Sequence, residues 1–237
     1  MEYPTLPLLR NRALPTAAFR TAAAPIIRSV IVKLHQHLLK MAVQEQNIVF
    51  VIILRAGLAF LDATIQQFPV SMIACAGLRR DEETAKAHWY YKNFPLLCQK
   101  HTAVILDPML ATGGSAMAVA QELQHRGILA QNTHYVGLLG APEGIMALSG
   151  MIPHENILLA KIDDCLDAKK FIVPGLGDFG DRYFGYVPTS PTPSVAPNTP
   201  QMPAATVPRS SGSSPLQGVG MRDVLHEGRS DDIRTHA

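Results

Sequence analysis

The residue types best suited to chemistry are concentrated in one run, Asp107-Pro108-Met109-Leu110-Ala111-Thr112-Gly113-Gly114-Ser115. It follows the short apolar stretch 102–106, which is typical of a buried parallel strand. Ligands bind at the carboxyl ends of such strands, and glycines let the backbone approach an anion closely. Residues 116–126 favour a helix whose N-terminal N–H groups would face this loop, with Thr112 or Ser115 as its cap. The pattern predicts a phosphate-binding loop that carries a carboxylate.

The predicted phosphate loop differs from a Walker loop, because no lysine follows its glycines. A monophosphate held by backbone N–H groups and hydroxyls is therefore the better interpretation. Taken alone, the same residues would also fit an ordinary strand-turn-helix corner.

Two further sets of residues could act on the same ligand. Arg55 directly follows the apolar run 48–54, so its guanidinium would project at the ligand edge of the sheet. Arg79 and Arg80 stand beside three acidic residues, a composition that also suits a solvated surface loop. Forked guanidinium donors suit diphosphate oxygens and can stabilise the charge of a leaving group.

Three ordered motifs resemble the uracil phosphoribosyltransferases, a branch of the type I phosphoribosyltransferase family. They are ILRAGL at 53–58, DPMLATGGSA at 107–116 and PGLGDFGDRYFG at 174–185. The similarity covers residues 9–185 and includes RDEET at 80–84 and APEG at 141–144. It implies a type I phosphoribosyltransferase-like α/β fold, with a parallel sheet flanked by helices and a small hood for the base.

The resemblance also implies the reaction. The phosphoribosyl group of 5-phosphoribosyl 1-diphosphate (PRPP) would move to N1 of uracil, giving UMP and diphosphate in pyrimidine salvage. Mg²⁺ would arrive with PRPP, so no protein metal ligands are expected. GTP is a candidate activator, and a homo-oligomer is expected.

By the same resemblance, residues can be assigned to catalysis and to each substrate. Catalysis is assigned to Arg55, Arg80, Asp107 and Asp178. PRPP binding is assigned to Arg55, Arg80, Asp107, Pro108, Met109, Leu110, Ala111, Thr112, Gly113, Gly114, Ser115 and Asp178. Uracil binding is assigned to Ile172, Gly177, Asp178 and Phe179, where glycine-rich backbone can accept uracil and reject cytosine.

Two departures from the family pattern leave other functions open. Only residues 41–47 separate the first helix from the strand at 48–54, and this interval is too short for the usual dimer arm. Family members commonly end their core with Gly-Thr, whereas here Gly185 is followed by Tyr186 and a long tail. Residues 3–44 also contain basic residues but no acid. The alternative is a non-catalytic nucleotide sensor or RNA-binding regulator; a third hypothesis is a scaffold that docks partners through its proline-rich tail.

Composition limits the remaining classes. The chain has 237 residues, 47% of them hydrophobic, and a net charge of +2, which suits one globular domain. It has no secretory signal and no apolar run long enough to cross a bilayer, so we expect a soluble cytoplasmic protein without membrane or nucleic-acid partners. Three separated cysteines form no CxxC pair, and His35 and His37 lack further ligands nearby, which argues against a structural metal site.

The order of apolar segments predicts an α/β domain over residues 1–186. Strands are expected at 48–54, 70–76, 102–106, 134–139 and 157–161, with helices at 20–40, 58–67, 116–126 and 142–148. Residues 187–237 are rich in proline and serine, cannot bury a core and are expected to be disordered.

Overall fold

The structure is a computed structural model, and it describes residues 3–80 and 87–186. The predicted tail at 187–237 lies outside the described residues, as does the side chain of Arg80. The domain boundary after residue 186 and the disorder of the tail therefore stay predictions.

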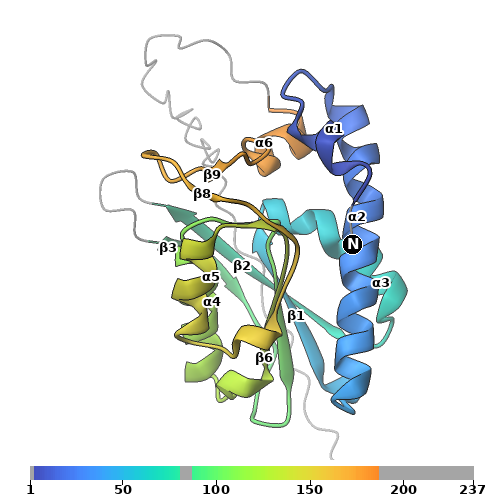
Figure 1. The fold of residues 1–237 in the computed structure, drawn as a ribbon. Coiled ribbons are helices and arrows are strands. Elements are labelled where there is room, and N and C mark those ends of the chain that lie inside the picture. Colours follow the sequence, from blue (N-terminus) through green and yellow to red (C-terminus); the bar gives the residue numbers. More distant parts are fainter. Residues whose placement is uncertain (1–2, 81–86, 187–237) are drawn as a thin grey trace, which may run out of the picture. The chain divides into compact units, whose positions relative to one another are not determined.

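A mixed, mainly parallel sheet forms the centre of the described domain (Figure 1). Its strands run in the order β3-β2-β1-β4-β6, and β5 and β7 both pair with β6. Only β3 is antiparallel to its neighbour, and it forms an edge. The bounds are β1 Ile48–Leu54, β2 Met72–Arg80, β3 Ala87–Asn93, β4 Thr102–Leu106, β5 Met109–Leu110, β6 Thr133–Gly140 and β7 Ile157–Ile162.

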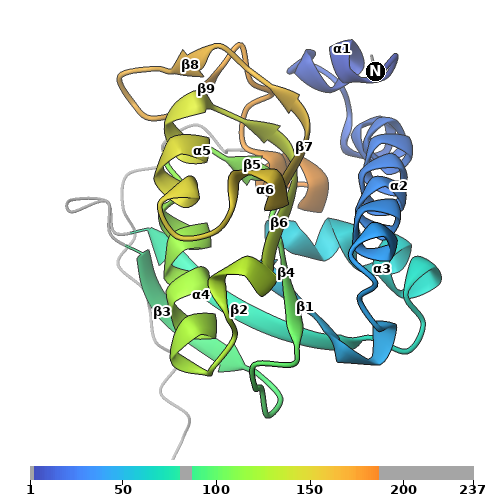
Figure 2. The ribbon, with the colours of Figure 1, turned by 60° about the horizontal axis from the view of Figure 1, so that its bottom comes forward.

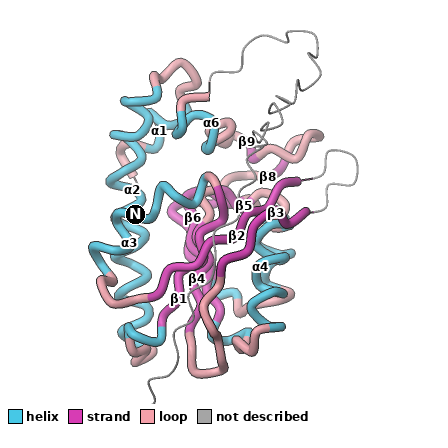
Figure 3. Tube along the Cα trace, turned by 180° about the vertical axis from the view of Figure 1, so that it is seen from behind, coloured by secondary structure: helices cyan, strands magenta, loops and turns pink. Residues whose placement is uncertain are grey.

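Helices cover both faces of the sheet, which explains why the central strands are buried on both sides and mostly apolar. α2 (Thr16–Lys40) and α3 (Leu61–Gln67) lie on one face, and α4 (Gly114–His125) and α5 (Pro142–Ser149) lie on the other (Figures 2 and 3). Successive residues of β1 join different cores: Phe50 belongs to the cluster under α2, and Val51 belongs to the cluster under α4. The sheet is therefore the middle layer of three.

A smaller layer lies beyond the carboxyl ends of the strands and forms the expected hood (Figure 2). It contains α1 (Leu6–Arg10), the antiparallel pair β8 (Cys165–Leu166) and β9 (Ile172–Val173), and α6 (Phe179–Phe184). Short 3₁₀ helices connect the larger elements: η1 Glu45–Asn47, η2 Ala56–Phe60, η3 Ala130–Asn132 and η4 His154–Asn156.

The predicted strands and helices are all present, with corrections at their ends. β2 runs from Met72 to Arg80 instead of over 70–76, because residues 77–80 continue the strand by pairing with β3. The segment 58–67 begins as the 3₁₀ helix η2 and becomes α-helical only at Leu61. Only a short turn and η1 join α2 to β1, so the described chain has no arm at that position.

The basic segment near the start packs on the domain as α2, the interpretation that the apolar spacing favours. Its buried stripe includes Phe19, Ile27 and Leu34. Two of its cations are held by the domain: the Arg20 Nε donates to the carbonyl of Tyr183, 2.6 Å away, and the Lys33 Nζ lies 2.7 Å from the hydroxyl of Tyr3. In the described chain, no helix has the length and apolar character needed to cross a membrane.

Candidate active site

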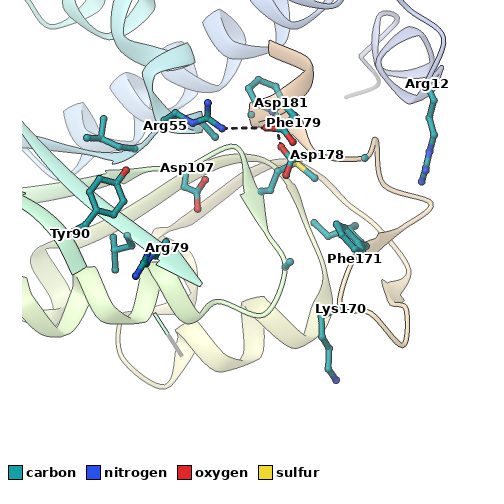
Figure 4. A pocket seen from close by; sticks show the side chains of 18 residues that line it. Arg12, Arg55, Arg79, Tyr90, Asp107, Lys170, Phe171, Asp178, Phe179 and Asp181 are labelled. Atoms are coloured by element: carbon teal, nitrogen blue, oxygen red, sulfur yellow. Dashed lines mark hydrogen bonds and ion pairs between the residues drawn. The ribbon is translucent and has the colours of Figure 1, made fainter. Parts of the chain in front are cut away.

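A cleft of about 640 Å³ opens between the carboxyl ends of β1, β2 and β4 and the hood (Figure 4). A second cavity of about 320 Å³ surrounds the predicted phosphate loop. Asp107, Met109, Ala111 and Asp178 line both cavities, so the two spaces adjoin. One extended ligand can therefore contact the loop and the cleft together.

The phosphate loop ends at Gly113, which occupies the N-cap position of α4 in the left-handed conformation, with φ at 79°. No side chain caps the helix, so the prediction that Thr112 or Ser115 does so is wrong. Glycine tolerates this conformation without strain, and it has no side chain to cap with. The first N–H groups of α4 and the two hydroxyls therefore face a cavity in which an anion would be stabilised.

α5 supports the phosphate loop through Gly144. A Cβ atom at this position would clash with the carbonyl oxygen of Ala111 and lie 2.8 Å from that of Leu110. A Cβ at Gly113 would in turn lie 3.1 Å from the carbonyl oxygen of Gly144. The sequence analysis assigns no role to Gly144. The APEG motif at 141–144, which is part of the family resemblance, is the feature that could have indicated one.

Asp107 lies half-buried at the junction of the two cavities. Its backbone is fixed by β6: the Asp107 N–H donates to Val136, 3.2 Å away, and the hydroxyl of buried Tyr135 donates to the Asp107 carbonyl at 2.8 Å. The pKa of the Asp107 carboxyl is raised to about 7, mainly by burial. A bond from the Met109 N–H opposes this rise, and the negative charge of Asp178 adds a smaller increase. A cation at this position would favour the ionised carboxylate.

Arg55 stands on the opposite wall, directly after β1, as predicted. Its Nη2 lies 3.3 Å from Oδ1 of Asp181, and both side chains are about half exposed. On β2, Arg79 lines the cleft. The role predicted for Arg80 stays a prediction. Arg79 adds a cation to the cleft wall, although the sequence analysis assigns diphosphate binding to Arg80 and not to Arg79.

Tyr90 enters the cleft because β3 contains a bulge. Gly77 pairs with Tyr91 and Leu78 pairs with Trp89, so Tyr90 is an extra residue without a partner in the ladder. Its ring lies over Gly77, where a Cβ atom would come within 2.6 Å of Tyr90 Cε2. Sequence reasoning missed β3 and Tyr90, because this exposed edge strand has no apolar run to announce it.

The hood brings the four predicted uracil residues together on the cleft wall: Ile172, Gly177, Asp178 and Phe179. Gly177 has a φ of 81°, a conformation that favours glycine. Asp178 caps α6, since its Oδ1 accepts a bond from the Asp181 N–H at 2.8 Å. Phe179 is buried and makes an edge contact with Phe19 of α2, with ring centroids 5.4 Å apart.

Two arginines that sequence reasoning did not select hold the hood in place. Arg10 makes a two-pronged pair with buried Asp163, at 2.8 and 2.6 Å, and the same carboxylate accepts a bond from the Gly175 N–H. Arg182 donates to the carbonyls of Leu9 and Leu176. Asp163 directly follows β7 at the ligand edge of the sheet. An acidic residue at the end of a predicted strand is the sequence feature that could have drawn attention to this pair.

The acidic side chains of the cleft determine whether it could bind a metal ion. No cluster of three or more His, Cys, Asp or Glu side chains suited to a metal ion occurs within residues 3–80 and 87–186. Asp107 and Asp178 nevertheless provide carboxylate oxygens, the donors that Mg²⁺ prefers. This donor set fits a magnesium ion held mainly by a phosphate ligand.

Comparison with known proteins agrees with this geometry. The family model "Uracil phosphoribosyltransferase" matches residues 5–186. The chain is 41% identical over 133 residues to a uracil phosphoribosyltransferase of Agathobacter rectalis, covering 56% of this chain and 63% of the relative, just under two thirds of its length. It is 36% identical over 194 residues to one from Lacticaseibacillus paracasei, covering 76% of this chain and 92% of that protein.

A solved structure is similar over nearly the whole domain. The AQ2163 protein from Aquifex aeolicus superimposes with a TM-score of 0.68 at 29% identity, covering 80% of this chain and 98% of that one. The family match spans the phosphate loop, the cleft and the hood, the three parts that the described geometry joins. The chain therefore belongs to the uracil phosphoribosyltransferase family.

Proposed function

We propose that the protein transfers the phosphoribosyl group of PRPP to N1 of uracil, giving UMP and diphosphate in pyrimidine salvage. The observation that carries this proposal is the continuity of the two cavities through Asp107 and Asp178. A ligand with its 5-phosphate in the loop would place its ribose at these two carboxylates. From there the diphosphate can reach Arg55, while the base can reach the hood.

The chemistry follows from that placement. The bond from C1 to the diphosphate oxygen breaks, the bond from N1 to C1 forms, and N1 loses its proton. Positive charge develops on the ribose in the transition state, and Asp107 and Asp178 would favour it. Arg55 and Arg80 would stabilise the diphosphate that leaves, and Asp178 is our candidate to accept the N1 proton.

Uracil would be selected by backbone groups of the hood. Its N3–H donor lies between two carbonyl acceptors, whereas cytosine presents an amino donor in place of one acceptor. The backbone at Ile172, Gly177 and Phe179 would match the uracil pattern and leave polar groups unpaired against cytosine. Asp107 and Asp178 could also hold the Mg²⁺ that accompanies PRPP, an ion that would neutralise the charge of the diphosphate.

A direct assay tests the proposal. Purified protein is incubated with labelled uracil, PRPP and Mg²⁺, and the expected product is UMP with an equal amount of diphosphate. Cytosine in place of uracil should give no nucleotide. Binding of UMP without turnover, at any protein or GTP concentration, would contradict catalysis and favour a nucleotide sensor.

Two further properties belong to the same proposal. We infer that the chain self-associates and that GTP is a candidate activator, both from the family resemblance. Sedimentation velocity with and without GTP, followed by activity measurements at matched concentrations, tests both. A fully active monomer whose rate does not change with GTP would contradict self-association and GTP activation, and it would leave the proposed reaction unaffected.

A further inference from the structure

The guanidinium of Arg55 is held by the segment that begins with α6. Its Cζ lies 4.5 Å from the ring centroid of Tyr186, and the ring of Phe184 is more distant at 5.9 Å. Its Nη2 lies 3.3 Å from Oδ1 of Asp181. A single short segment therefore supplies both an aromatic contact and an acidic partner to this cleft arginine.

The two contacts use different parts of the guanidinium. The face of an aromatic ring attracts a guanidinium that lies over it. The hydrogen bonds of the guanidinium are instead donated at its edge, from its N–H groups, which point outward in the plane of the guanidinium. A diphosphate would also bind through that edge, by forked hydrogen bonds. A diphosphate ligand therefore competes with Asp181 and leaves the contact with Tyr186 in place.

The acidic contact is easily exchanged. The Arg55 and Asp181 side chains are 48% and 42% exposed, and ion pairs at such positions contribute little to stability. The aromatic contact acts differently, because it limits the rotamers of a long side chain before any ligand arrives. Ordering such a side chain on binding otherwise weakens the affinity about two- to ten-fold.

We propose that Tyr186 is a positioning residue for Arg55, covering its guanidinium so that the edge is presented to the diphosphate of the substrate. Before the ligand binds, Asp181 contacts the same edge, and the ligand then replaces it. This inference rests on the proposed function, since that function supplies the diphosphate.

The test is binding of inorganic diphosphate with Mg²⁺ to the full chain, measured by isothermal titration calorimetry. Tyr186→Ala should weaken binding about two- to ten-fold, because the Arg55 side chain must then be ordered by the ligand itself. Tyr186→Phe keeps the ring and should bind like the wild type. Tyr91→Ala is the matched control, since Tyr91 is a similarly exposed tyrosine outside the residues that line the cleft.

A double-mutant cycle separates positioning from a general effect on the fold. Arg55→Ala should weaken diphosphate binding, and adding Tyr186→Ala to that variant should cause no further loss. Asp181→Asn should bind diphosphate at least as tightly as the wild type. An equal loss from Tyr186→Ala with and without Arg55, or a loss in Tyr186→Phe as large as in Tyr186→Ala, would overturn the proposal.

Turnover gives an independent readout. In an active protein, Tyr186→Ala should raise KM for PRPP and leave KM for uracil unchanged. If the wild type binds diphosphate in a Tyr186-dependent way but makes no UMP, the proposed reaction fails and the positioning role stands. If it makes UMP while Tyr186→Ala binds diphosphate normally, the positioning role fails alone.

Discussion

Asp107 combines two properties that oppose each other in the free protein. Its carboxyl is shielded from water and faces the charge of Asp178, so its pKa is raised to about 7. Its proposed work, holding the ribose and favouring positive charge, requires the ionised form. The protonation state of one residue therefore links pH to substrate binding.

The kinetic consequence can be measured directly. We expect kcat/KM for PRPP to rise with pH through about 7, because this parameter reports the ionisation of the free enzyme. Asp107→Asn should lower kcat by about 100-fold or more and remove that rise. Initial rates between pH 5.5 and 8.5, at saturating uracil, provide the profile. A wild-type profile that is flat across this range would contradict the role of the Asp107 carboxylate.

At the scale of elements, the phosphate loop depends on the helix behind it. α5 comes so close to the loop that only glycine fits at position 144. Gly144→Ala should displace the loop and lower kcat/KM for PRPP by about 10- to 100-fold, the cost of small misplacements in a binding site. Steady-state kinetics and a thermal melt check the activity and the fold.

Gly150→Ala is the matched control for that change. Gly150 is the C-cap of the same helix, its φ is −71°, and a Cβ there would lie 3.3 Å from the carbonyl of Ala147. The φ suits alanine, and the contact is with the backbone of α5 itself, which must shift by a few tenths of an ångström. The position lies away from the loop. Equal losses of kcat/KM in the two variants would show that α5 acts through stability alone.

The same elements show what the sequence could predict. β1, β4 and β6 are apolar runs buried on both faces, so their local composition was sufficient to place the sheet and the loop at its edge. The assignment of the hood residues depended on the family resemblance, because a glycine-rich loop has no hydrophobic periodicity from which its structure could be predicted. Their meeting in one cleft depends on contacts between distant segments, such as Arg10 with Asp163.

Where prediction was incomplete, tertiary contacts decided the outcome. The bulge in β3 brings Tyr90 to the cleft, and pairing between β2 and β3 places Arg79 on its wall. Neither feature has a local signal. The cap of α4 was predicted wrongly because Thr112 and Ser115 are common cap residues, whereas the turn itself requires a left-handed glycine.

For the whole molecule, a second titratable group matters, and it is buried on the face of the sheet that α2 covers. His134 of β6 is fully buried and its ring makes an edge contact with His37 of α2, at 5.4 Å between centroids. Within the described residues, neither of its ring nitrogens has a hydrogen-bond partner. Burial, and to a smaller extent His37, lowers the pKa of His134 to about 4.

The two groups change stability with pH in opposite directions. Between about pH 4 and 6.5, the unfolded chain holds a proton on His134 that the folded protein does not, so this residue makes stability rise with pH. Between about pH 4 and 7, the folded protein holds a proton on Asp107 that the unfolded chain has lost, so stability falls with pH. Each group contributes up to one proton to the slope, and in the wild type the two contributions oppose each other.

Single substitutions should separate these contributions. Relative to the wild type, Asp107→Asn should make the unfolding free energy rise more steeply between pH 4.5 and 6.5, because the effect of His134 is then unopposed. His134→Leu should shift the slope in the opposite direction, and His125→Gln, at an exposed position of α4, should leave it unchanged. Urea unfolding at several pH values measures all three slopes. Because slopes are compared, a constant cost of repacking at position 134 does not affect the result, and slopes shifted in the same direction would disprove the opposition.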